Sequence, residues 1–317
     1  MAAGEKSLKI SGLSRTGLRM AKQTAKAQFV WAAYAAGLAR RSVRYSTKSF
    51  EYEPHAQIID GLVTDGFFVL RNAVPKAPLQ QLMNEFEIAL ETENVGPIIR
   101  NPGAEGDQQF LDKLEISLGS SAIASRADIA YAKDPLVSCP ATLPLVFSDL
   151  VIDIGRAFYN CLPAVTDVSV MRTFVNDLPA DGFGLFHCDY QSPRFIKFFF
   201  YLNDVGLDDG PFCYVRGSHR NKPLTWRGNN QRTLADVQKI YGPDAVRLLK
   251  AKVGDLIIAD VSGFHRGLKP CARDRTVLMV NTGVHPVDVP DTNVVDCQFA
   301  EGLSPKLAAA TDFLRRV

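Results

Sequence analysis

The sequence predicts a mainly β domain with flanking helices, of the jelly-roll or sandwich type. Its second half contains short apolar segments at close spacing, a pattern typical of β-sandwiches and barrels. Turn sequences separate several of these segments, notably Asp209-Gly210-Pro211 and Gly254-Asp255. The chain has 317 residues, of which 46% are hydrophobic and 22% charged, so it can bury a single large core.

Composition argues against several classes of protein. A net charge of +2 gives no sign of a nucleic-acid-binding domain, which is usually strongly basic. The six cysteines include no C-x-x-C pair, which favours a reducing compartment over a disulfide framework or a structural zinc site. The longest apolar run, residues 29–39, has about half of the ~20 residues that a membrane-spanning helix needs. We therefore expect a cytoplasmic protein with no transmembrane helix and no nucleic-acid partner.

Residues 1–50 form a basic arm with ten Lys or Arg and one acid, Glu5. An apolar face repeats there at helical spacing, and its members are Met20, Ala27, Trp31, Tyr34 and Leu38, with Thr24 as the polar member. The opposite face carries Arg15, Arg19, Lys22 and Lys26. A basic amphipathic helix of this kind is typical of peripheral membrane contact, here through residues 15–44.

Two other interpretations of the basic arm stay open. A helix that packs on the following domain would show a similar pattern. An Arg-rich transit peptide over residues 1–45 would place the protein in mitochondria or another organelle. The predicted location is therefore cytoplasmic, with membrane association if the arm binds lipid, and the sequence indicates no oligomeric state.

The domain itself is expected over residues 55–300. Asp65-Gly66 favours a turn before a buried strand at 67–70. A helix follows, with Pro78 in its first turn and an inward face made of Leu79, Leu82, Met83, Phe86 and Leu90. Residues 96–132 are expected as loops and short helices because their periodicity is weak, and a helical segment is predicted at 144–159.

The second half supplies most of the strands. They are predicted at 168–175, 185–189, 195–202, 212–215, 255–260 and 276–283. Helical spacing at 233–249 predicts an insertion, about residues 231–250, over one mouth of the barrel. Ser304-Pro305 predicts the start of a C-terminal helix within residues 301–317, because Ser is a favourable cap and Pro suits the first turn.

The triplet His187-Cys188-Asp189 is a candidate metal site. On a strand, residues two apart point to the same face, so the imidazole and the carboxylate can converge on one ion while Cys188 points away. His265 follows the strand that begins at Gly254-Asp255. Two histidines and one carboxylate form the facial triad of non-haem iron oxygenases, which leaves positions open for a co-substrate and O2. His187, Asp189 and His265 are thus the predicted catalytic residues and Fe(II) ligands.

Arg275 opens the last strong strand, ten residues after His265. An arginine among Thr, Val, Leu and Met is costly to point inward unless it meets an anion, and its guanidinium matches a carboxylate bidentately. The distal carboxylate of 2-oxoglutarate would satisfy it. Arg273 lies on the same face if the strand starts early, so it stays an alternative.

Motifs along the chain combine into a wider pattern. They are His187-Cys188-Asp189, Tyr201-Leu202-Asn203-Asp204-Val205, Gly210-Pro211-Phe212 and Arg216-Gly217-Ser218-His219-Arg220, then residues 253–258 with His265 and Arg275 after them, and residues 66–71 before an amphipathic helix. Together these motifs, which span most of residues 57–290, resemble the phytanoyl-CoA dioxygenase family.

The resemblance implies a double-stranded β-helix, which is a cupin-like jelly roll, with Fe(II) on the predicted triad and 2-oxoglutarate on Arg275. Related oxygenases sometimes use a lysine from a neighbouring strand, which makes Lys197 a second candidate for binding 2-oxoglutarate. The implied activity is a dioxygenase that uses O2, converts 2-oxoglutarate to succinate and hydroxylates a small-molecule, lipid or sugar-linked substrate. A non-enzymatic jelly-roll module that binds a metal or a carbohydrate is the alternative.

Residues around the predicted site are candidates for substrate contact. They are Arg172, Tyr190, Gln191, Arg216 and His219. Residues 211–235 include no acid, whereas five cations occur there, namely Arg216, Arg220, Lys222, Arg227 and Arg232. Such a field would favour an anionic substrate, and a solvated surface is the alternative. His219 is expected to fix its loop or to touch the substrate rather than to bind the metal.

Overall fold

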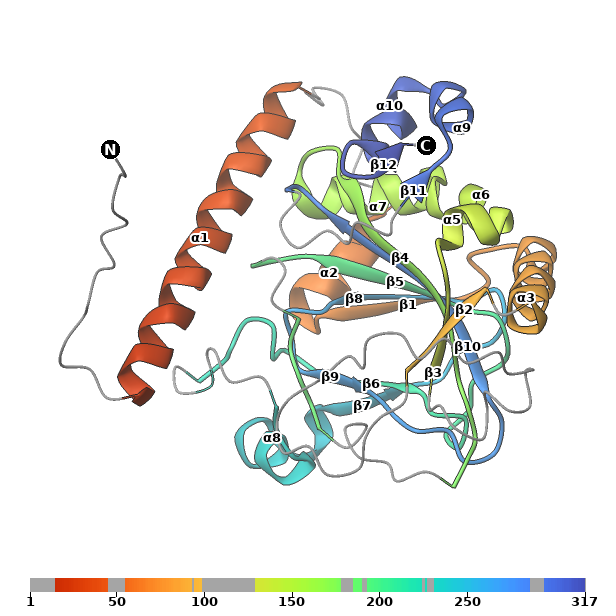
Figure 1. The fold of residues 1–317 in the computed structure, drawn as a ribbon. Helices are drawn as coiled ribbons and strands as arrows, with labels where there is room; N and C mark the ends of the chain where they lie inside the picture. Colours follow the sequence, from red (N-terminus) through yellow and green to blue (C-terminus); the bar gives the residue numbers. More distant parts are fainter. Residues whose placement is uncertain are drawn as a thin grey trace, which may run out of the picture.

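A computed structural model gives the architecture in Figure 1. It describes residues 15–44, 55–92, 94–98, 129–177, 185–189, 193–223, 226, 231–285 and 294–316. Two antiparallel sheets face each other, and helices cover the outer side of the larger sheet. This arrangement confirms the predicted mainly β jelly roll with flanking helices.

The larger sheet has seven strands in the order β1-β8-β5-β10-β4-β3-β2. Their bounds are Phe67–Leu70, Leu256–Asp260, Ile196–Tyr201, Arg275–Gly283, Ala164–Thr173, Ile129–Ala132 and Val95–Ile98, in that order. The smaller sheet has the order β7-β6-β9, with bounds Val246–Leu249, Phe212–Val215 and His265–Gly267. Phe199 of β5 meets Phe212 of β6 with ring centroids 4.5 Å apart, so side chains fill the space between the sheets.

Alternation along the strands of the large sheet separates two of the three apolar clusters of the described residues. In β5, Phe198 and Phe200 lie in the cluster shared with the helices, whereas Phe199 and Tyr201 lie in the cluster between the sheets. Successive side chains of a strand point to opposite faces, so an almost continuous aromatic run serves both clusters. The polar exception in this strand, Lys197, shares a face with Phe199 and therefore points between the sheets.

The helices on the large sheet include the two predicted near residues 79–90 and 144–159 and one, at residues 56–64, that was not predicted. α3, Lys76–Glu91, buries Leu79, Leu82 and Phe86 against the sheet. α2, Ala56–Thr64, and α7, Asp149–Tyr159, lie on the same side (Figure 1). The remaining short helices are α5 Pro135–Ser138, α6 Leu143–Val146, α8 Leu234–Tyr241, α9 Cys297–Glu301 and α10 Pro305–Ala308, with 3₁₀ turns at Pro140–Thr142, Pro243–Ala245 and Ala309–Thr311.

The basic arm contains one long helix, α1, from Arg15 to Arg44. Its last turns pack on the domain, because Tyr34 and Leu38 join the helix-side core and Gly37 lies against the backbone of Val284. Arg41 is buried beside them. At these positions α1 therefore packs on the domain, which was one of the three interpretations of the basic arm. Membrane contact stays a prediction, and no helix among the described residues is both long and apolar enough to span a bilayer.

Four predicted elements differ from the observed ones. Residues 246–249, expected as helix, form β7 of the small sheet, so the insertion is helical only as far as residue 245. Residues 185–189 make isolated bridges rather than a full strand. The weakly periodic segment 96–132 contributes β2 and β3. Beyond α10, the C-terminal segment ends in β12, Arg315–Arg316, which pairs with β11, Val294–Val295.

Candidate metal centre

Backbone hydrogen bonds bring the triplet and the third predicted ligand together. The N–H of His187 donates to the carbonyl of His265 and the N–H of His265 donates back, both at 2.9 Å. The N–H of Asp189 donates to the carbonyl of Val261 at 3.0 Å. These bonds place the extended segment 185–189 alongside β9 and the end of β8, with His187 directly opposite His265.

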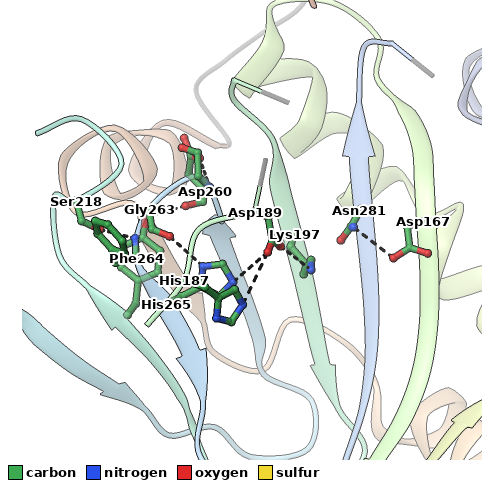
Figure 2. Close-up of polar contacts among 12 residues, drawn as sticks. Asp167, His187, Asp189, Lys197, Ser218, Asp260, Gly263, Phe264, His265 and Asn281 are labelled. Carbon is green, nitrogen blue, oxygen red and sulfur yellow. Dashed lines mark hydrogen bonds and ion pairs between the residues drawn. The ribbon is translucent and has the colours of Figure 1, made fainter. Parts of the chain in front are cut away.

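The three side chains converge between the two sheets (Figure 2). The Nε2 atoms of His187 and His265 each lie 3.8 Å from Oδ1 of Asp189. The imidazole centroids are 4.5 Å apart. One ligand atom from each residue lies within 4.8 Å of the other two, so a single cation could contact all three.

The backbone fixes the orientation of His265. Its Nδ1 lies 2.9 Å from the carbonyl oxygen of Gly263, and because a carbonyl only accepts, Nδ1 carries the hydrogen. The lone pair of Nε2 then faces Asp189. Burial, reinforced by the neighbouring His187, lowers the pKa of His265 to about 3. The imidazole is therefore neutral at ordinary pH, which is the form that binds a metal.

The Asp189 carboxylate has a second partner besides the imidazoles. Its Oδ2 accepts a hydrogen bond from Nζ of Lys197 at 3.1 Å. Burial alone would raise the pKa of Asp189, but Lys197 and the two histidines outweigh it and lower that pKa. Burial would likewise lower the pKa of Lys197, but Asp189 and Asp167 outweigh it and raise that pKa. The carboxylate and the ammonium are therefore both charged.

These donors fit Fe(II). Two imidazole nitrogens and one carboxylate oxygen are the ligands of the two-histidine, one-carboxylate iron sites, which leave further positions open. Lys197 occupies Oδ2 of Asp189 and so leaves Oδ1 to face the ion. The side chain of His187 is 43% exposed, so the residues that the structure describes leave the site partly open to solvent.

Arg275 is buried between the sheets on the side of the site toward Gly267. Its Nη2 donates to Oγ1 of Thr173 at 2.9 Å, and its Nη1 donates to the carbonyl of Gly210. Among the described residues no carboxylate pairs with this guanidinium, and its buried Nε has no hydrogen-bond partner. Burial lowers the pKa of Arg275, as expected for a cation that lacks a counter-ion.

Arg273 occupies a different environment although it is only two residues away. It donates two hydrogen bonds to Asp209, at 3.1 and 2.7 Å, and its side chain is 63% exposed. Its guanidinium is therefore already paired at the surface. Three residues are candidates for binding the distal carboxylate of 2-oxoglutarate. Lys197 pairs with Asp189 and Arg273 pairs with Asp209. Arg275 is buried and has no acidic partner among the described residues.

The predicted substrate residues that the structure describes, Arg172, Arg216 and His219, make polar contacts away from the metal ligands. Arg172 points to the helix side of β4, where its guanidinium pairs with Glu87 of α3 at 2.5 Å. Arg172 alternates with Met171 and Thr173, and those two residues face between the sheets. This placement corrects the expectation that Arg172 touches the substrate. Tyr190 and Gln191 lie outside the described residues.

Arg216 and His219 contact the end of α2 and the residue that follows it. Arg216 lies 4.0 Å from Asp65, and Nε2 of His219 lies 3.1 Å from the carbonyl of Val63. Arg220 and Lys222 likewise bind backbone carbonyls, of Thr64 and Ser262. These contacts fit a loop-fixing role for His219, and Arg227 lies outside the described residues.

Sequence reasoning missed two polar residues near Lys197. Asn281 of β10 and Asp167 of β4 lie beside Lys197 in the same face of the large sheet (Figure 2). A signal for Asn281 was present, because an amide directly follows the apolar run 277–280 within the predicted strand. Asp167 precedes the predicted start of its strand, so its direction was not predicted.

The metal-ligand segment also matches a known family. Residues 176–269 match the phytanoyl-CoA dioxygenase family. The predicted resemblance is thereby confirmed over that range. The matched range contains the His187, Asp189 and His265 cluster and ends before Arg275, so the phytanoyl-CoA dioxygenase match covers the metal centre but not the buried arginine. No curated protein matches the sequence significantly.

Solved structures with the same fold include two proteins of nogalamycin biosynthesis and one from Streptomyces hygroscopicus. The epimerase SnoN from nogalamycin biosynthesis, in complex with Fe3+, alpha ketoglutarate and nogalamycin RO, has a TM-score of 0.53 and 11% identity over 74% of this chain and 84% of that chain. The carbocyclase SnoK from the same biosynthesis has a TM-score of 0.53 and 15% identity over 72% and 83%. HygX from Streptomyces hygroscopicus, with nickel and 2-oxoglutarate bound, has a TM-score of 0.50 and 16% identity over 76% and 90%. At these identities the likeness establishes the shared fold.

Proposed function

We propose that this chain is an Fe(II)- and 2-oxoglutarate-dependent oxygenase that hydroxylates a small organic substrate. One observation carries the proposal: His187, Asp189 and His265 converge within 4.8 Å between the two sheets. The buried Arg275, which has no acid partner among the described residues, supports it. The Fe3+ and alpha ketoglutarate named for SnoN, and the 2-oxoglutarate named for HygX, support an iron ion and 2-oxoglutarate as the cofactors here.

The side chains have separate tasks in this proposal. The neutral imidazoles and the Asp189 carboxylate would hold Fe(II), and Lys197 would keep Asp189 bound through one oxygen. Arg275 would bind the distal carboxylate of 2-oxoglutarate as a fork. Bound Fe(II) supplies the activation of O2. The balanced reaction converts 2-oxoglutarate, O2 and a C–H bond into succinate, CO2 and a C–OH group.

Succinate formation tests the oxygenase. The purified protein is incubated with Fe(II), 2-oxoglutarate and O2, and succinate is measured for the wild type, Asp189→Ala and the exposed control Asp244→Ala. The wild type and the control should turn over equally, and Asp189→Ala should lose at least about 100-fold because a metal ligand is gone. If the wild type formed no succinate, and Asp189→Ala bound the metal as tightly as the wild type does, the non-enzymatic binding module would be favoured instead.

Isotope labelling tests hydroxylation as the reaction type. An oxygenase that hydroxylates transfers one atom of labelled O2 to its product, so the product mass rises by one labelled oxygen. SnoN is described as an epimerase and SnoK as a carbocyclase. A product without labelled oxygen, formed together with succinate, would contradict hydroxylation and leave the oxidative half-reaction intact.

A further inference from the structure

Three polar side chains form one row across the large sheet. Lys197 of β5 pairs in register with Asn281 of β10, which pairs with Asp167 of β4. Directly paired residues lie about 5 Å apart on the same face of a sheet. We call Lys197, Asn281 and Asp167 the polar rung. Figure 2 shows it leading away from Asp189 across the strands.

The rest of this face is mainly apolar. The next row contains Phe199, Met279 and Ser169, and the one after it Tyr201, Val277 and Met171. Burying polar groups in such a face is unfavourable unless they are hydrogen-bonded. The polar rung is therefore an exception that needs partners.

The partners within the polar rung are incomplete. Nζ of Lys197 is held by Asp189. Nδ2 of Asn281 donates to Oδ2 of Asp167 at 3.3 Å, and because a carboxylate only accepts, this bond fixes the amide orientation. Oδ1 of Asn281 is then left buried, with no hydrogen-bond partner among the described residues. The Asn281 side chain, only 2% exposed, thus presents an unused acceptor.

The polar rung and Arg275 lie on opposite sides of the metal centre. Asn281 and Arg275 are six residues apart along β10, which is about 20 Å between their Cα atoms. The Arg275 guanidinium reaches back to Gly267, beyond His265 on β9, whereas the polar rung adjoins Asp189. A dicarboxylate held by Arg275 would leave the polar rung available to the substrate.

The charges of the site favour a neutral substrate group. With Fe(II) and 2-oxoglutarate bound, the metal, Lys197 and Arg275 balance Asp189, Asp167 and the two carboxylates of the co-substrate. The polar rung offers acceptors at Asp167 and Asn281 and donors at Lys197 and Asn281. A hydroxyl group both donates and accepts, so it matches this mixture, whereas an ammonium only donates.

We propose that the polar rung binds hydroxyl groups of the substrate, which makes the substrate a polyol or a sugar-bearing compound. This inference rests on the proposed function, because it places the substrate beside the metal. Asn281 would accept a hydrogen bond from one hydroxyl, and Asp167 would accept from a neighbouring one. An apolar lipid chain would leave the buried Oδ1 of Asn281 without a hydrogen-bond donor.

Ligand-observed NMR tests the polar rung with defined probes. The protein is loaded with diamagnetic Zn(II) and 2-oxoglutarate, and saturation transfer is measured to methyl β-glucopyranoside, to 2-methoxytetrahydropyran and to cyclohexylamine. These probes offer a six-membered ring with hydroxyls, the same ring without them, and an ammonium. The glucoside should give the strongest transfer. Asn281→Leu and Asp167→Asn should each weaken glucoside binding at least about fivefold, the effect of one lost hydrogen bond.

Controls separate this inference from the proposed function. Asp244→Asn, at an exposed site, should bind the glucoside as the wild type does, and circular dichroism establishes that each variant is folded. No glucoside binding by the wild type, equal binding by both variants, or stronger binding of either other probe would overturn the polar rung. If the wild type also fails to bind 2-oxoglutarate or to form succinate, the proposed function fails as well.

Discussion

Arg275 combines burial, charge and incomplete pairing in one side chain. It is 4% exposed and its guanidinium contacts a hydroxyl and backbone carbonyls. A buried cation without a counter-ion is costly, so the arrangement is best satisfied when an anion binds. Single substitutions can show which of Arg275, Arg273 and Lys197 binds 2-oxoglutarate.

Arg275→Gln should raise the KM for 2-oxoglutarate by roughly 100-fold, because two charge-assisted hydrogen bonds to a carboxylate are lost. The matched change Arg273→Gln should alter that KM by less than about threefold, since it removes only a surface pair. The KM is measured by succinate formation. A larger effect from Arg273→Gln would assign the anchor to the surface arginine.

Lys197→Met should act on the metal instead. Removing the ammonium frees Oδ2 of Asp189, and loss of such a supporting contact typically weakens metal affinity by about 10- to 100-fold. Isothermal titration with Fe(II) under argon measures this affinity, and the succinate assay gives the KM for 2-oxoglutarate. If Lys197→Met raised that KM as much as Arg275→Gln does and left the metal affinity unchanged, Lys197 would be the anchor.

Two of the three metal ligands could be predicted from local spacing, whereas His265 was predicted from its position after a later strand and from the combined motifs. His187 and Asp189 are two residues apart in extended chain, and that alone puts them on one side. Arg273 and Arg275 are two residues apart, so alternation along a strand would place both on the same face. Alternation therefore could not show that Arg275 is buried and Arg273 exposed. The face of Arg172 depends on where its strand pairs, and the sequence does not specify that register.

At the scale of elements, Asp255 joins the start of β8 to the end of β1. Its carboxylate accepts from the backbone N–H groups of Asn72 and Lys252 at 3.0 and 2.9 Å and from Arg71 at 2.6 Å. Burial alone would raise the pKa of Asp255, but these three hydrogen bonds outweigh it and lower that pKa. The carboxylate therefore stabilises the fold only while it is ionised.

Asp255→Asn should reduce the free energy of unfolding by about 2 kcal/mol at neutral pH, because charged hydrogen bonds are lost. A pKa that is lower in the folded state gives stability above the unfolded pKa of about 4, and this stability is lost as the pH falls further. The difference from the wild type should therefore shrink below about pH 4. Urea unfolding at several pH values measures it, with Asp244→Asn as the control, and a difference that grows in acid would contradict the sign.

β7 shows why one element was assigned wrongly. Val246, Arg247 and Leu248 are all at least partly exposed on this edge strand, so the segment lacks the apolar alternation of a half-buried strand. Its apolar residues also continue the spacing of α8. The available signal was Gly242-Pro243, which ends that helix with a positive φ at Gly242.

At the scale of the whole molecule, Arg41 ties α1 to two distant segments. Its guanidinium donates to the carbonyls of Leu162 and Pro163 at 2.6 and 2.8 Å. It also donates to the carbonyl of Ala309 at 2.9 Å and to Asp312 at 3.0 Å. The basic arm is therefore joined at this residue to both the domain and the C-terminal segment.

Arg41→Met should lower the free energy of unfolding by about 3 kcal/mol, because Asp312 and three carbonyls lose a buried donor. The exposed neighbour provides a matched control, and Arg40→Met should change stability by less than about 0.5 kcal/mol. Chemical denaturation measures both. Equal effects would mean that the contacts of Arg41 contribute nothing specific.

The overall architecture could be predicted as a class because strand patterns and turn residues recur through the second half. The position of α1 could not, because an amphipathic helix looks the same whether its apolar side meets a protein or a lipid surface. The buried Arg41 distinguishes the packed state, and its partners lie up to 271 residues away.

That separation has a consequence for synthesis. The Ala309 carbonyl that Arg41 binds is added 268 residues later, which at ~5–20 residues per second takes roughly half a minute on the ribosome. Throughout that interval the nascent basic helix lacks its last docking partners.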